Sequence, residues 1–223
     1  MKKHLAALFV LALTACHPHQ PQNIADYKQS LVQYHDSGYY MRDFAVVDRK
    51  AQRYLDTHLA GVKQPAIVLD IDETSLSNWP EMLANNFDKP ADSGPCTLPK
   101  GPCAHHAWQA MARGEALLPT LSLYQDAKSR NVAVFFITGR DEALRAATER
   151  NLKAAGYTDW VKLVMRPHGS TTPSAADYKA PERAKIEGAG YTIIESVGDQ
   201  QSDLSGGHAQ ETFLVPNPWY RIP

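Results

Sequence analysis

The sequence lacks an excess of charge of either sign, and it contains no internal repeat or low-complexity run. Lysine and arginine number 23 against 24 aspartates and glutamates, which gives a formal net charge of −1 over 223 residues. Binding to nucleic acid depends on clustered positive charge, so this balance argues against an obligate nucleic-acid partner. The length suffices for one α/β domain with a sizeable core. Composition gives no indication of the oligomeric state.

The sequence also lacks an apolar run long enough to cross a membrane. Its short apolar segment 5–13 follows a basic N-terminal stretch and has the length of a signal-peptide core. We therefore expect residues 1–15 to be a signal peptide that directs export of the protein. Residues 16–22 would then form a tether, followed by one folded domain over 23–223.

Cysteine is scarce, and each of the three cysteines has its own interpretation. Cys16 ends the segment Leu-Thr-Ala-Cys, which resembles the lipobox of bacterial lipoproteins. We expect it to carry lipid and to anchor the protein to a membrane, facing the periplasm or the cell surface, with soluble secretion as the alternative. Cys96 and Cys103 are expected to form a disulfide, because export leads to an oxidising environment. A metal site with His105 and His106 is disfavoured, since the spacing is not that of zinc ligands, and we expect both histidines at the surface.

Hydrophobic periodicity predicts helices and strands in alternation. Two helices are expected within 23–59, with a break at Ser37-Gly38 and the second helix longer. Apolar runs predict five strands, at 66–71, 132–137, 162–165, 191–197 and 211–215. Helices are expected among them at 118–130, 142–155 and 181–187. This alternation predicts the α/β class, a Rossmann-like, doubly wound parallel sheet with N-terminal helices.

The proline-rich stretch of about 75–118 is too long for a simple loop. We expect it to form a small cap insertion with a helix at 104–113. Its aromatic residues Trp79, Phe87 and Trp108 have two interpretations that the sequence leaves open. They could stack a nucleobase, or they could pack the cap onto the core.

Polar side chains follow four of the predicted strands at the points where the strands end. They are Asp70 with Asp72, Thr138, Lys179, and Asp199 with Asp203. Because the carboxyl ends of parallel strands lie at one edge of a sheet, we expect these residues to converge in a crevice there. Neighbouring carboxylates need a compensating cation or a shared proton. Oxygen ligands without a dense basic cluster suit Mg²⁺.

These residue types also indicate a chemistry. Mg²⁺, Lys179 and the hydroxyl of Thr138 could together bind a phosphate group. One carboxylate, with its charge offset by cations, could attack phosphorus as a covalent nucleophile. A second could give a proton to the leaving oxygen and later take one from water. The sequence therefore predicts a site for hydrolysis of phosphate monoesters.

The same motifs resemble those of a known superfamily. They are the segments Asp70-Ile-Asp-Glu-Thr74, Ile137-Thr-Gly-Arg140, Tyr178-Lys179 and Gly198-Asp-Gln-Gln-Ser-Asp-Leu204. In this order they resemble the haloacid dehalogenase (HAD) superfamily. The sequence is most similar to its subfamily IIIB, exported acid phosphatases that include lipoprotein 5′-nucleotidases and plant vegetative-storage-type proteins. The resemblance implies the HAD fold and a phosphoric monoester hydrolase that forms an aspartyl-phosphate, with nucleoside 5′-monophosphates as a candidate substrate class.

The resemblance also implies roles for individual residues. It makes Asp70 the nucleophile and Asp72 the acid and base. It implies that Mg²⁺ is held by the Asp70 side chain, the Asp72 backbone carbonyl and Asp199, with Asp203 further out or acting through water. By the same resemblance Thr138 and Lys179 bind the phosphate of the substrate.

The residues present also bear on alternatives to these assignments, and Asp72 and Asp199 disfavour a dehalogenase, which does not need the extra acids. Lys185 is a rival for the role of Lys179, which we prefer because the Tyr-Lys pair matches the family and Lys185 is predicted within a helix. A non-catalytic storage or binding protein on the same fold usually loses the nucleophile, whereas Asp70 and Asp72 are both present. A phosphoacceptor receiver domain is disfavoured, because its phosphorylated aspartate ends the third strand and not the first.

Overall fold

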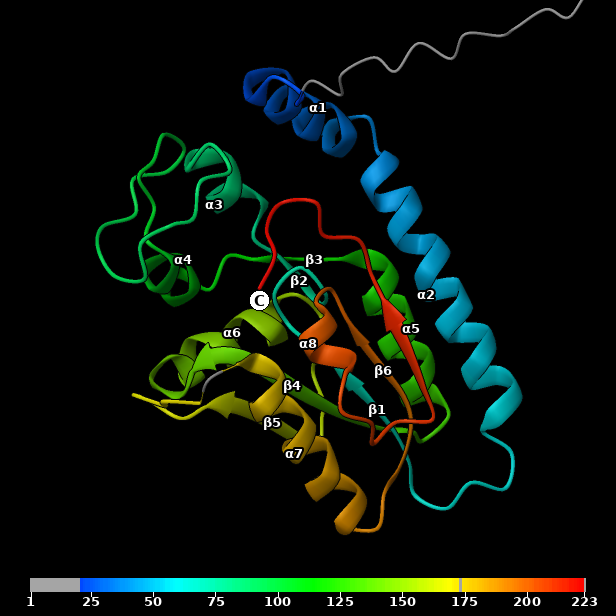
Figure 1. Cartoon of the computed structure of the whole chain (residues 1–223). Helices are drawn as coiled ribbons and strands as arrows, with labels where there is room; N and C mark the ends of the chain where they lie inside the picture. Colours follow the sequence, from blue (N-terminus) through cyan, green and yellow to red (C-terminus); the bar gives the residue numbers. More distant parts are fainter. Residues whose placement is uncertain (1–20, 173, 223) are drawn as a thin grey trace, which may run out of the picture.

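The computed structural model of the chain describes residues 21–172 and 174–222. At its centre are the strands β1 (Pro65–Leu69), β4 (Ala133–Asp141), β5 (Lys162–Arg166), β6 (Thr192–Gly198) and β7 (Glu211–Leu214). They form one sheet with the order β5-β4-β1-β6-β7, in which every neighbouring pair is parallel (Figure 1). The predicted α/β class with a doubly wound parallel sheet is confirmed.

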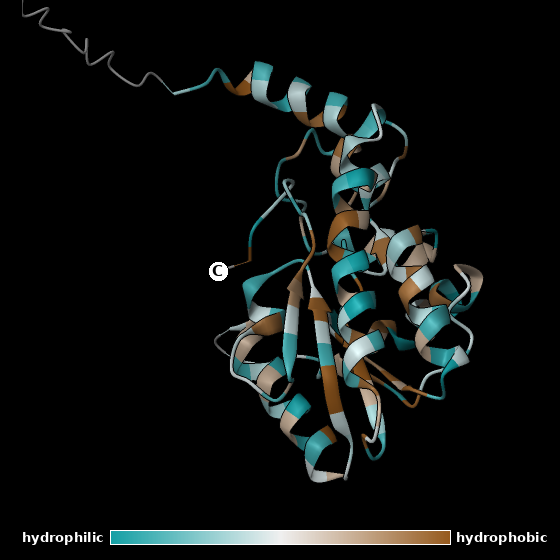
Figure 2. Cartoon of the chain, turned by 90° about the vertical axis from the view of Figure 1, so that its right-hand side faces the viewer, coloured by the Kyte–Doolittle hydropathy of each residue, from teal (hydrophilic) through white to brown (hydrophobic). Residues whose placement is uncertain are grey.

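Helices cover both faces of this sheet. Outside the segment between β1 and α5, the helices are α1 (Ile24–Asp36), α2 (Tyr39–His58), α5 (Leu118–Ser129), α6 (Arg145–Ala154), α7 (Ala175–Gly188) and the short α8 (Gln201–Leu204), with a 3-10 turn η1 (Glu142–Leu144) before α6. Of these, α1 packs on α2. One face of the sheet packs against α2 and α5, and the other against α7. In side view α2 shows alternating hydrophobic and hydrophilic bands (Figure 2), as an amphipathic helix that covers a core does.

The side chains of β1 fill the core on both faces of the sheet. Ile67 and Leu69 belong to the larger apolar cluster, on the side of α2 and α5, whereas Ala66 and Val68 belong to the smaller cluster beside α7. All four residues are at most 3 % exposed. Successive strand residues point to opposite faces, so a strand buried on both sides is apolar throughout. The apolar run ends at Leu69, and the next residue is Asp70.

The two N-terminal helices separate where the sequence predicts. Gly38 has a φ of 78°, in the left-handed region that a glycine adopts without strain. The chain turns there between α1 and α2. The longer α2 then buries residues three or four positions apart, among them Phe44, Ala51 and Leu55.

The start of α7 differs from the sequence prediction. This helix begins at Ala175, with Ser174 as its cap, and not near residue 181. Pro181 lies inside the helix, where a proline removes one hydrogen bond. Apolar packing of α7 against the sheet on both sides of the proline offsets this loss. Lys179 therefore lies on a helix and not in the preceding loop.

β4 is also longer than predicted, and it continues to Asp141. Its pairing with β5 is irregular between Thr138 and Asp141. The Asp141 carboxylate accepts a hydrogen bond from the backbone N–H of Ala143 at 2.8 Å and caps the η1 turn. The predicted helix 142–155 therefore begins as a 3-10 turn, and Thr138 and Arg140 belong to the irregular end of the strand.

Between the first strand and α5 the chain contains an inserted segment, which we call the cap. It contains α3 (Trp79–Ala84), α4 (His105–Met111) and the antiparallel pair of β2 (Leu76–Ser77) with β3 (Glu115–Ala116). A disulfide joins Cys96 to Cys103 in the loop between α3 and α4. α4 lies within the predicted helix 104–113, and Figure 1 shows α3 and α4 together on one side of the molecule.

Within the described ranges, no helix combines the length and the apolar character that crossing a bilayer requires. The predicted signal peptide over 1–15 and the predicted lipidation site Cys16 lie outside the described residues.

Two acids lie in the core between the sheet and the helices. Asp48 of α2 is 4 % exposed and Glu195 of β6 is fully buried. Burial raises the pKa of Asp48 to about 7, although a hydrogen bond from Thr120 opposes the shift. Burial and then the charge of Asp48 raise the pKa of Glu195 well above its ordinary value. Both acids are therefore neutral at low pH and become charged inside the core only as the pH rises.

This arrangement predicts a pH-dependent stability. Folding raises the pKa of Asp48, so the folded protein favours the protonated form of this acid. The stabilisation is complete below the unfolded pKa of 3.8, and it is lost as the pH rises to about 7. Asp48→Asn, which stays neutral, should stabilise the protein by roughly 2–4 kcal/mol at about pH 8 and change it little at about pH 4. Urea unfolding at both pH values measures this difference.

The matched control is Asp43→Asn, which removes an acid from a half-exposed position of the same helix. It should change the free energy of unfolding by about 0.5 kcal/mol or less at either pH. If Asp48→Asn has the same effect at both pH values, Asp48 is not a protonated acid in the folded protein.

Candidate active site

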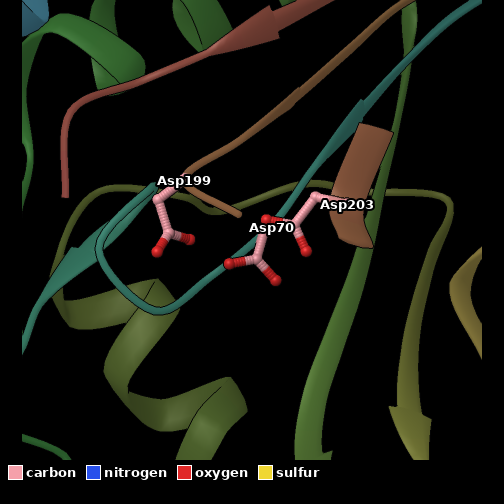
Figure 3. A group of neighbouring side chains, drawn as sticks. All are labelled: Asp70, Asp199 and Asp203. Carbon is pink, nitrogen blue, oxygen red and sulfur yellow. The ribbon is translucent and has the colours of Figure 1, made fainter. Parts of the chain in front are cut away.

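Three aspartates converge at the carboxyl edge of the sheet. Asp70 directly follows β1, Asp199 follows β6, and Asp203 lies on α8. Carboxylate oxygens from the three residues lie within 4.8 Å of one another, and all three residues are buried. Figure 3 shows the three side chains gathered in one place from these separate elements. The predicted convergence of these strand ends is thus present in the fold.

The topology explains why these acids meet. Leu69 at the end of β1 pairs with Val197 of β6, and the Asp70 N–H donates to the carbonyl of Val197 at 3.0 Å. After β1 the chain first builds the β4 side of the sheet and then returns to build the β6 side. The crevice between β1 and β6 is therefore the point where the strand order reverses, which is where open α/β sheets bind ligands.

Lys179 supplies the positive charge in this cluster. Its Nζ donates to Asp70 Oδ1 at 2.6 Å and to Asp203 Oδ1 at 2.5 Å, and the residue is 5 % exposed. Burial alone would lower the pKa of Lys179, but the charges of Asp203 and Asp70 outweigh burial and raise it. The amine is therefore protonated. Lys185, the alternative phosphate-binding residue, lies outside this cluster. Its side chain is exposed and pairs with Glu182.

The cluster still carries excess negative charge. Burial raises the pKa of Asp70 well above its ordinary value, and although Lys179 opposes this shift, Asp203 and Asp199 add to it. Burial and the charge of Asp203 raise the pKa of Asp199 to about 7, against hydrogen bonds from Asn217 and Gln200. A divalent cation bound by oxygen ligands would remove this excess. The donor set therefore fits Mg²⁺.

Asp72 makes a different set of contacts. Arg140 donates to its carboxylate through Nη2 at 2.7 Å and through Nε at 3.0–3.1 Å. Asn78 Nδ2 donates to Asp72 Oδ1 at 2.8 Å. Burial by itself would raise the pKa of Asp72, but the charge and hydrogen bonds of Arg140 lower it. The Asp72 side chain is 18 % exposed, against 7 % for Asp70, so it is the more open of the two.

Arg140 is a site residue that sequence reasoning missed. Its side chain is 1 % exposed and is fixed on Asp72, 68 residues away in the sequence. The signal was present, because Arg140 ends the motif that begins at Ile137. Thr138 in the same motif is fully buried, and its Oγ1 accepts a hydrogen bond from the Arg140 N–H at 3.2 Å. Binding of phosphate by Thr138 remains a prediction.

Several neighbours fix Asp199. Thr74 Oγ1 donates to Asp199 Oδ1 at 3.2 Å. Gln200 Nε2 and Asn217 Nδ2 both donate to Asp199 Oδ2, at 2.5 and 2.7 Å. Thr74 belongs to the motif that follows β1, and Asn217 lies in the segment after β7. The orientation of this carboxylate is therefore set by three separate parts of the chain.

The position of Asp203 depends on two residues that sequence reasoning did not identify as functional. A Cβ added to Gly198 would lie 2.3 Å from Asp203 Cβ, so only glycine allows this close approach. Arg183, 1 % exposed, donates to the backbone carbonyls of Asp203 at 2.6 Å and Gly207 at 2.9 Å, and also to that of Ser205. α7 thus delivers both Lys179 and Arg183 to the α8 segment.

The cap contributes polar and aromatic contacts near the site. His105 keeps 30 % of its side chain exposed, and its Nδ1 lies 2.9 Å from Oε1 of the fully buried Glu81. Trp108 is 2 % exposed and hydrogen-bonded, which favours the interpretation that it packs the cap. Trp79 is partly buried and stacks on His35 with ring centroids 3.7 Å apart.

Comparison with known proteins identifies the family. A family model described as HAD superfamily, subfamily IIIB (Acid phosphatase) matches residues 4–223. The chain is 35 % identical to the stem 28 kDa glycoprotein of Glycine max over 189 residues, which cover 82 % of this chain and 70 % of that protein. It is 31 % identical to acid phosphatase 1 of Solanum lycopersicum over 204 residues, which cover 91 % and 76 %.

A solved structure shares the fold. The class C acid phosphatase from Bacillus anthracis matches with a TM-score of 0.70 at 22 % identity, over 89 % of this chain and 86 % of that one. The parallel sheet with acids and a lysine at its carboxyl edge defines a hydrolase of the HAD type. The chain belongs to subfamily IIIB of that superfamily, the acid phosphatases. It is therefore a phosphoric monoester hydrolase, and the resemblance noted in its sequence is confirmed.

Proposed function

We propose that this protein is an exported, Mg²⁺-dependent acid phosphatase that hydrolyses phosphate monoesters through an aspartyl-phosphate on Asp70. The observation that carries the proposal is the division of the site into two parts. The buried cluster of Asp70, Lys179, Asp199 and Asp203 combines a nucleophile with cation-binding groups. Asp72 lies outside that cluster and is more open, as a residue that exchanges protons must be.

In the first step Asp70 attacks phosphorus. Lys179 is bound to Oδ1 of Asp70, which leaves Oδ2 to form the new oxygen–phosphorus bond. The bond between phosphorus and the ester oxygen breaks, and Asp72, which must carry a proton at this step although Arg140 lowers its pKa, gives that proton to the oxygen as the alcohol leaves. In the second step Asp72 takes a proton from water, the water oxygen attacks phosphorus, and the bond to Asp70 breaks. Inorganic phosphate and the starting form of both aspartates result.

Mg²⁺ fits the acids of the buried cluster. Asp70 and Asp199 would hold it with their side chains and Asp72 with its backbone carbonyl, while Asp203 would act from further out or through water. When bound, Mg²⁺ offsets charge on the phosphate oxygens and on the carboxylates. Thr138 and Lys179 would bind the phosphate oxygens. Thr74, Gln200 and Asn217 hold Asp199 in place for this role.

Nucleoside 5′-monophosphates are the substrate class that we propose. Partly buried aromatic side chains gather where the cap meets the N-terminal helices. Trp79 lies one residue after Asn78, which contacts Asp72, and its ring packs on those of Phe87 and Trp219. Trp79 and Phe87 are only partly buried, so a ring of this group could stack a nucleobase.

We further propose that residues 1–15 are a signal peptide and 16–22 a tether for the domain 23–223, with the cap over about 75–118. Lipid on Cys16 would anchor the enzyme to a bacterial membrane, facing the periplasm or the outer surface. Partition of the full chain into a detergent phase, lost in Cys16→Ala, tests this proposal. Equal partition of both forms would contradict it and leave soluble secretion.

The storage-protein alternative is not favoured by the site. Asp70 and Asp72 are both present. Lys179 contacts Asp70, and Arg140 contacts Asp72. A protein without catalysis has no need of this arrangement. Release of phosphate from a monoester separates the two functions directly.

The test is phosphate release from a panel of monoesters, including a nucleoside 5′-monophosphate, a sugar phosphate and a chromogenic aryl phosphate. Activity should be lost on treatment with EDTA and return with Mg²⁺. A preference for the nucleotide in kcat/KM would support the proposed substrate class. Activity that resists prolonged chelation would contradict the metal requirement, and no release from any monoester would leave the storage function.

A further inference from the structure

Asn78 connects the cap to the catalytic edge of the sheet. The residue is fully buried. Its side-chain Nδ2 donates to Asp72 Oδ1 and to Glu73 Oε2, both at 2.8 Å. Its backbone N–H donates to Glu73 Oε1 at 2.6 Å. Its remaining polar atom, Oδ1, accepts a hydrogen bond from the indole Nε1 of Trp108 at 2.7 Å. Each polar group of the Asn78 amide therefore has a partner.

The chemistry of these partners allows one orientation of the amide. An indole N–H can only donate, and the carboxylate of Asp72, whose pKa Arg140 lowers, accepts in its ionised form. A reversed Asn78 amide would place its oxygen against the Asp72 carboxylate and its NH₂ group against the indole N–H. The hydrogen bonds to Asp72 and to Trp108 would both be lost, and like partial charges would face each other. The indole of Trp108 therefore keeps the amide NH₂ group directed at Asp72.

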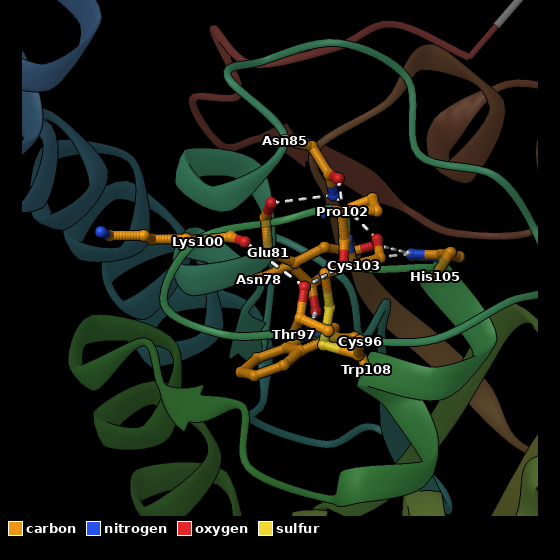
Figure 4. The surroundings of a disulfide bond; sticks show 10 residues. All are labelled: Asn78, Glu81, Asn85, Cys96, Thr97, Lys100, Pro102, Cys103, His105 and Trp108. Carbon is orange, nitrogen blue, oxygen red and sulfur yellow. Dashed lines mark hydrogen bonds and ion pairs between the residues drawn. A yellow bond between two sulfur atoms is a disulfide. The ribbon is translucent and has the colours of Figure 1, made fainter.

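The cap holds Trp108 in position for this contact. The Asn85 side chain accepts from the Cys103 N–H at 3.0 Å and donates to the Cys103 carbonyl at 2.8 Å, which fixes the segment leading into α4. Glu81 of α3 is fully buried and contacts His105 in the first turn of α4. Figure 4 shows these residues around Trp108 and the disulfide. α3 and α4 are thus joined by partly buried polar contacts.

We propose that Trp108 is a positioning residue for proton transfer by Asp72. It does not touch the substrate, and it acts through Asn78, which fixes one side of the Asp72 carboxylate while Arg140 fixes the other. The proposal rests on the proposed function, in which Asp72 protonates the leaving oxygen. It gives the cap a part in the chemical step, beyond the selection of substrates.

The expected consequence depends on the leaving group. A poor leaving group needs its proton from Asp72, whereas a good leaving group departs with less help. Trp108→Phe keeps the aromatic ring in the core and removes only the N–H, so that Asn78 loses the contact that fixes its amide. We expect kcat/KM to fall about tenfold for phenyl phosphate and about threefold or less for 4-nitrophenyl phosphate.

The experiment compares four proteins on both substrates with Mg²⁺ present. They are the native enzyme, Trp108→Phe, the control Trp160→Phe and the reference Asp72→Asn. Trp160 is partly buried and packs on Phe136 of the core, so its substitution should affect both substrates equally and weakly. Asp72→Asn should show the strongest dependence on the leaving group. If Asp72→Asn shows none, the proposed function fails, because Asp72 is then not the proton donor.

If Asp72→Asn shows the dependence and Trp108→Phe does not, the positioning role of Trp108 is overturned while the proposed function stands. A second measurement on the native protein covers the case in which Trp108→Phe does not fold. The indole N–H of Trp108 should exchange with solvent far more slowly than an exposed indole, as nuclear magnetic resonance can detect. Rapid exchange of that proton would also overturn the proposal.

Discussion

Asp70→Asn should leave a folded protein that releases phosphate at no more than about one ten-thousandth of the native rate. An amide oxygen in place of the carboxylate is too weak a nucleophile to form a bond with phosphorus. The substitution keeps the shape of the side chain, and it removes an acid whose pKa burial raises, so it should not lower the stability. Phosphate release from 4-nitrophenyl phosphate measures the activity, and circular dichroism measures the fold.

The control for this variant is Asp141→Asn, which changes another acid at the carboxyl end of a strand. Asp141 contacts His168 and caps the η1 turn, and asparagine can cap it equally well. This control should keep activity within about twofold of the native enzyme. The native enzyme quenched in acid during turnover should also carry phosphate that Asp70→Asn lacks. Full activity of Asp70→Asn would contradict covalent catalysis by this residue.

Lys179→Met should be both inactive and unstable. The amine of Lys179 is the cation shared by Asp70 and Asp203, and its loss leaves two buried carboxylates without their partner. Breaking a buried ion pair in this way costs about 3–5 kcal/mol. The loss of a charge that would contact the phosphate should lower kcat/KM by about 100-fold or more. Urea unfolding and initial rates of phosphate release measure the two effects.

Lys185→Met is the matched control, on the same helix and six residues further along. Lys185 is 68 % exposed in its side chain and pairs with Glu182, and an exposed pair of this kind contributes about 0.5 kcal/mol or less. Its removal should leave activity and stability close to the native values. The reverse outcome, with Lys185→Met inactive and Lys179→Met active, would assign phosphate binding to Lys185.

The convergence of the acids could be predicted from sequence because it follows from topology. Asp70 comes directly after an apolar run and Asp199 closely follows another predicted strand, and parallel strands place such positions at one edge. No knowledge of side-chain packing was required. Lys179 lies beside these acids as expected, but it reaches them from the helix α7 and not from a loop. The proline at 181 concealed that helix, because local propensity carries no information about packing on the sheet.

The contacts that hold these acids could not be predicted in the same way. Arg140 binds a side chain 68 residues away, and Arg183 binds a backbone carbonyl 20 residues away. Asn78 binds Asp72, six residues before it, through its side-chain amide. The sequence alone does not show whether an arginine is buried or exposed, because burial depends on the packing of the folded chain. The contact between Trp108 and Asn78 depends in addition on how α4 lies on α3, which no periodicity in the cap indicates.

The hydrogen bonds of the acid cluster connect parts of the chain that are far apart. Lys179 and Asp70 are 109 residues apart, and Thr74 and Asp199 are 125 apart. No fragment that lacks either end of these pairs can contain the site. Loops of this length close late and slowly compared with the turns of single helices. Enzymatic activity is therefore a stringent reporter of complete folding: during renaturation it will return with the pairing of β1 and β6, after helical signals have already recovered.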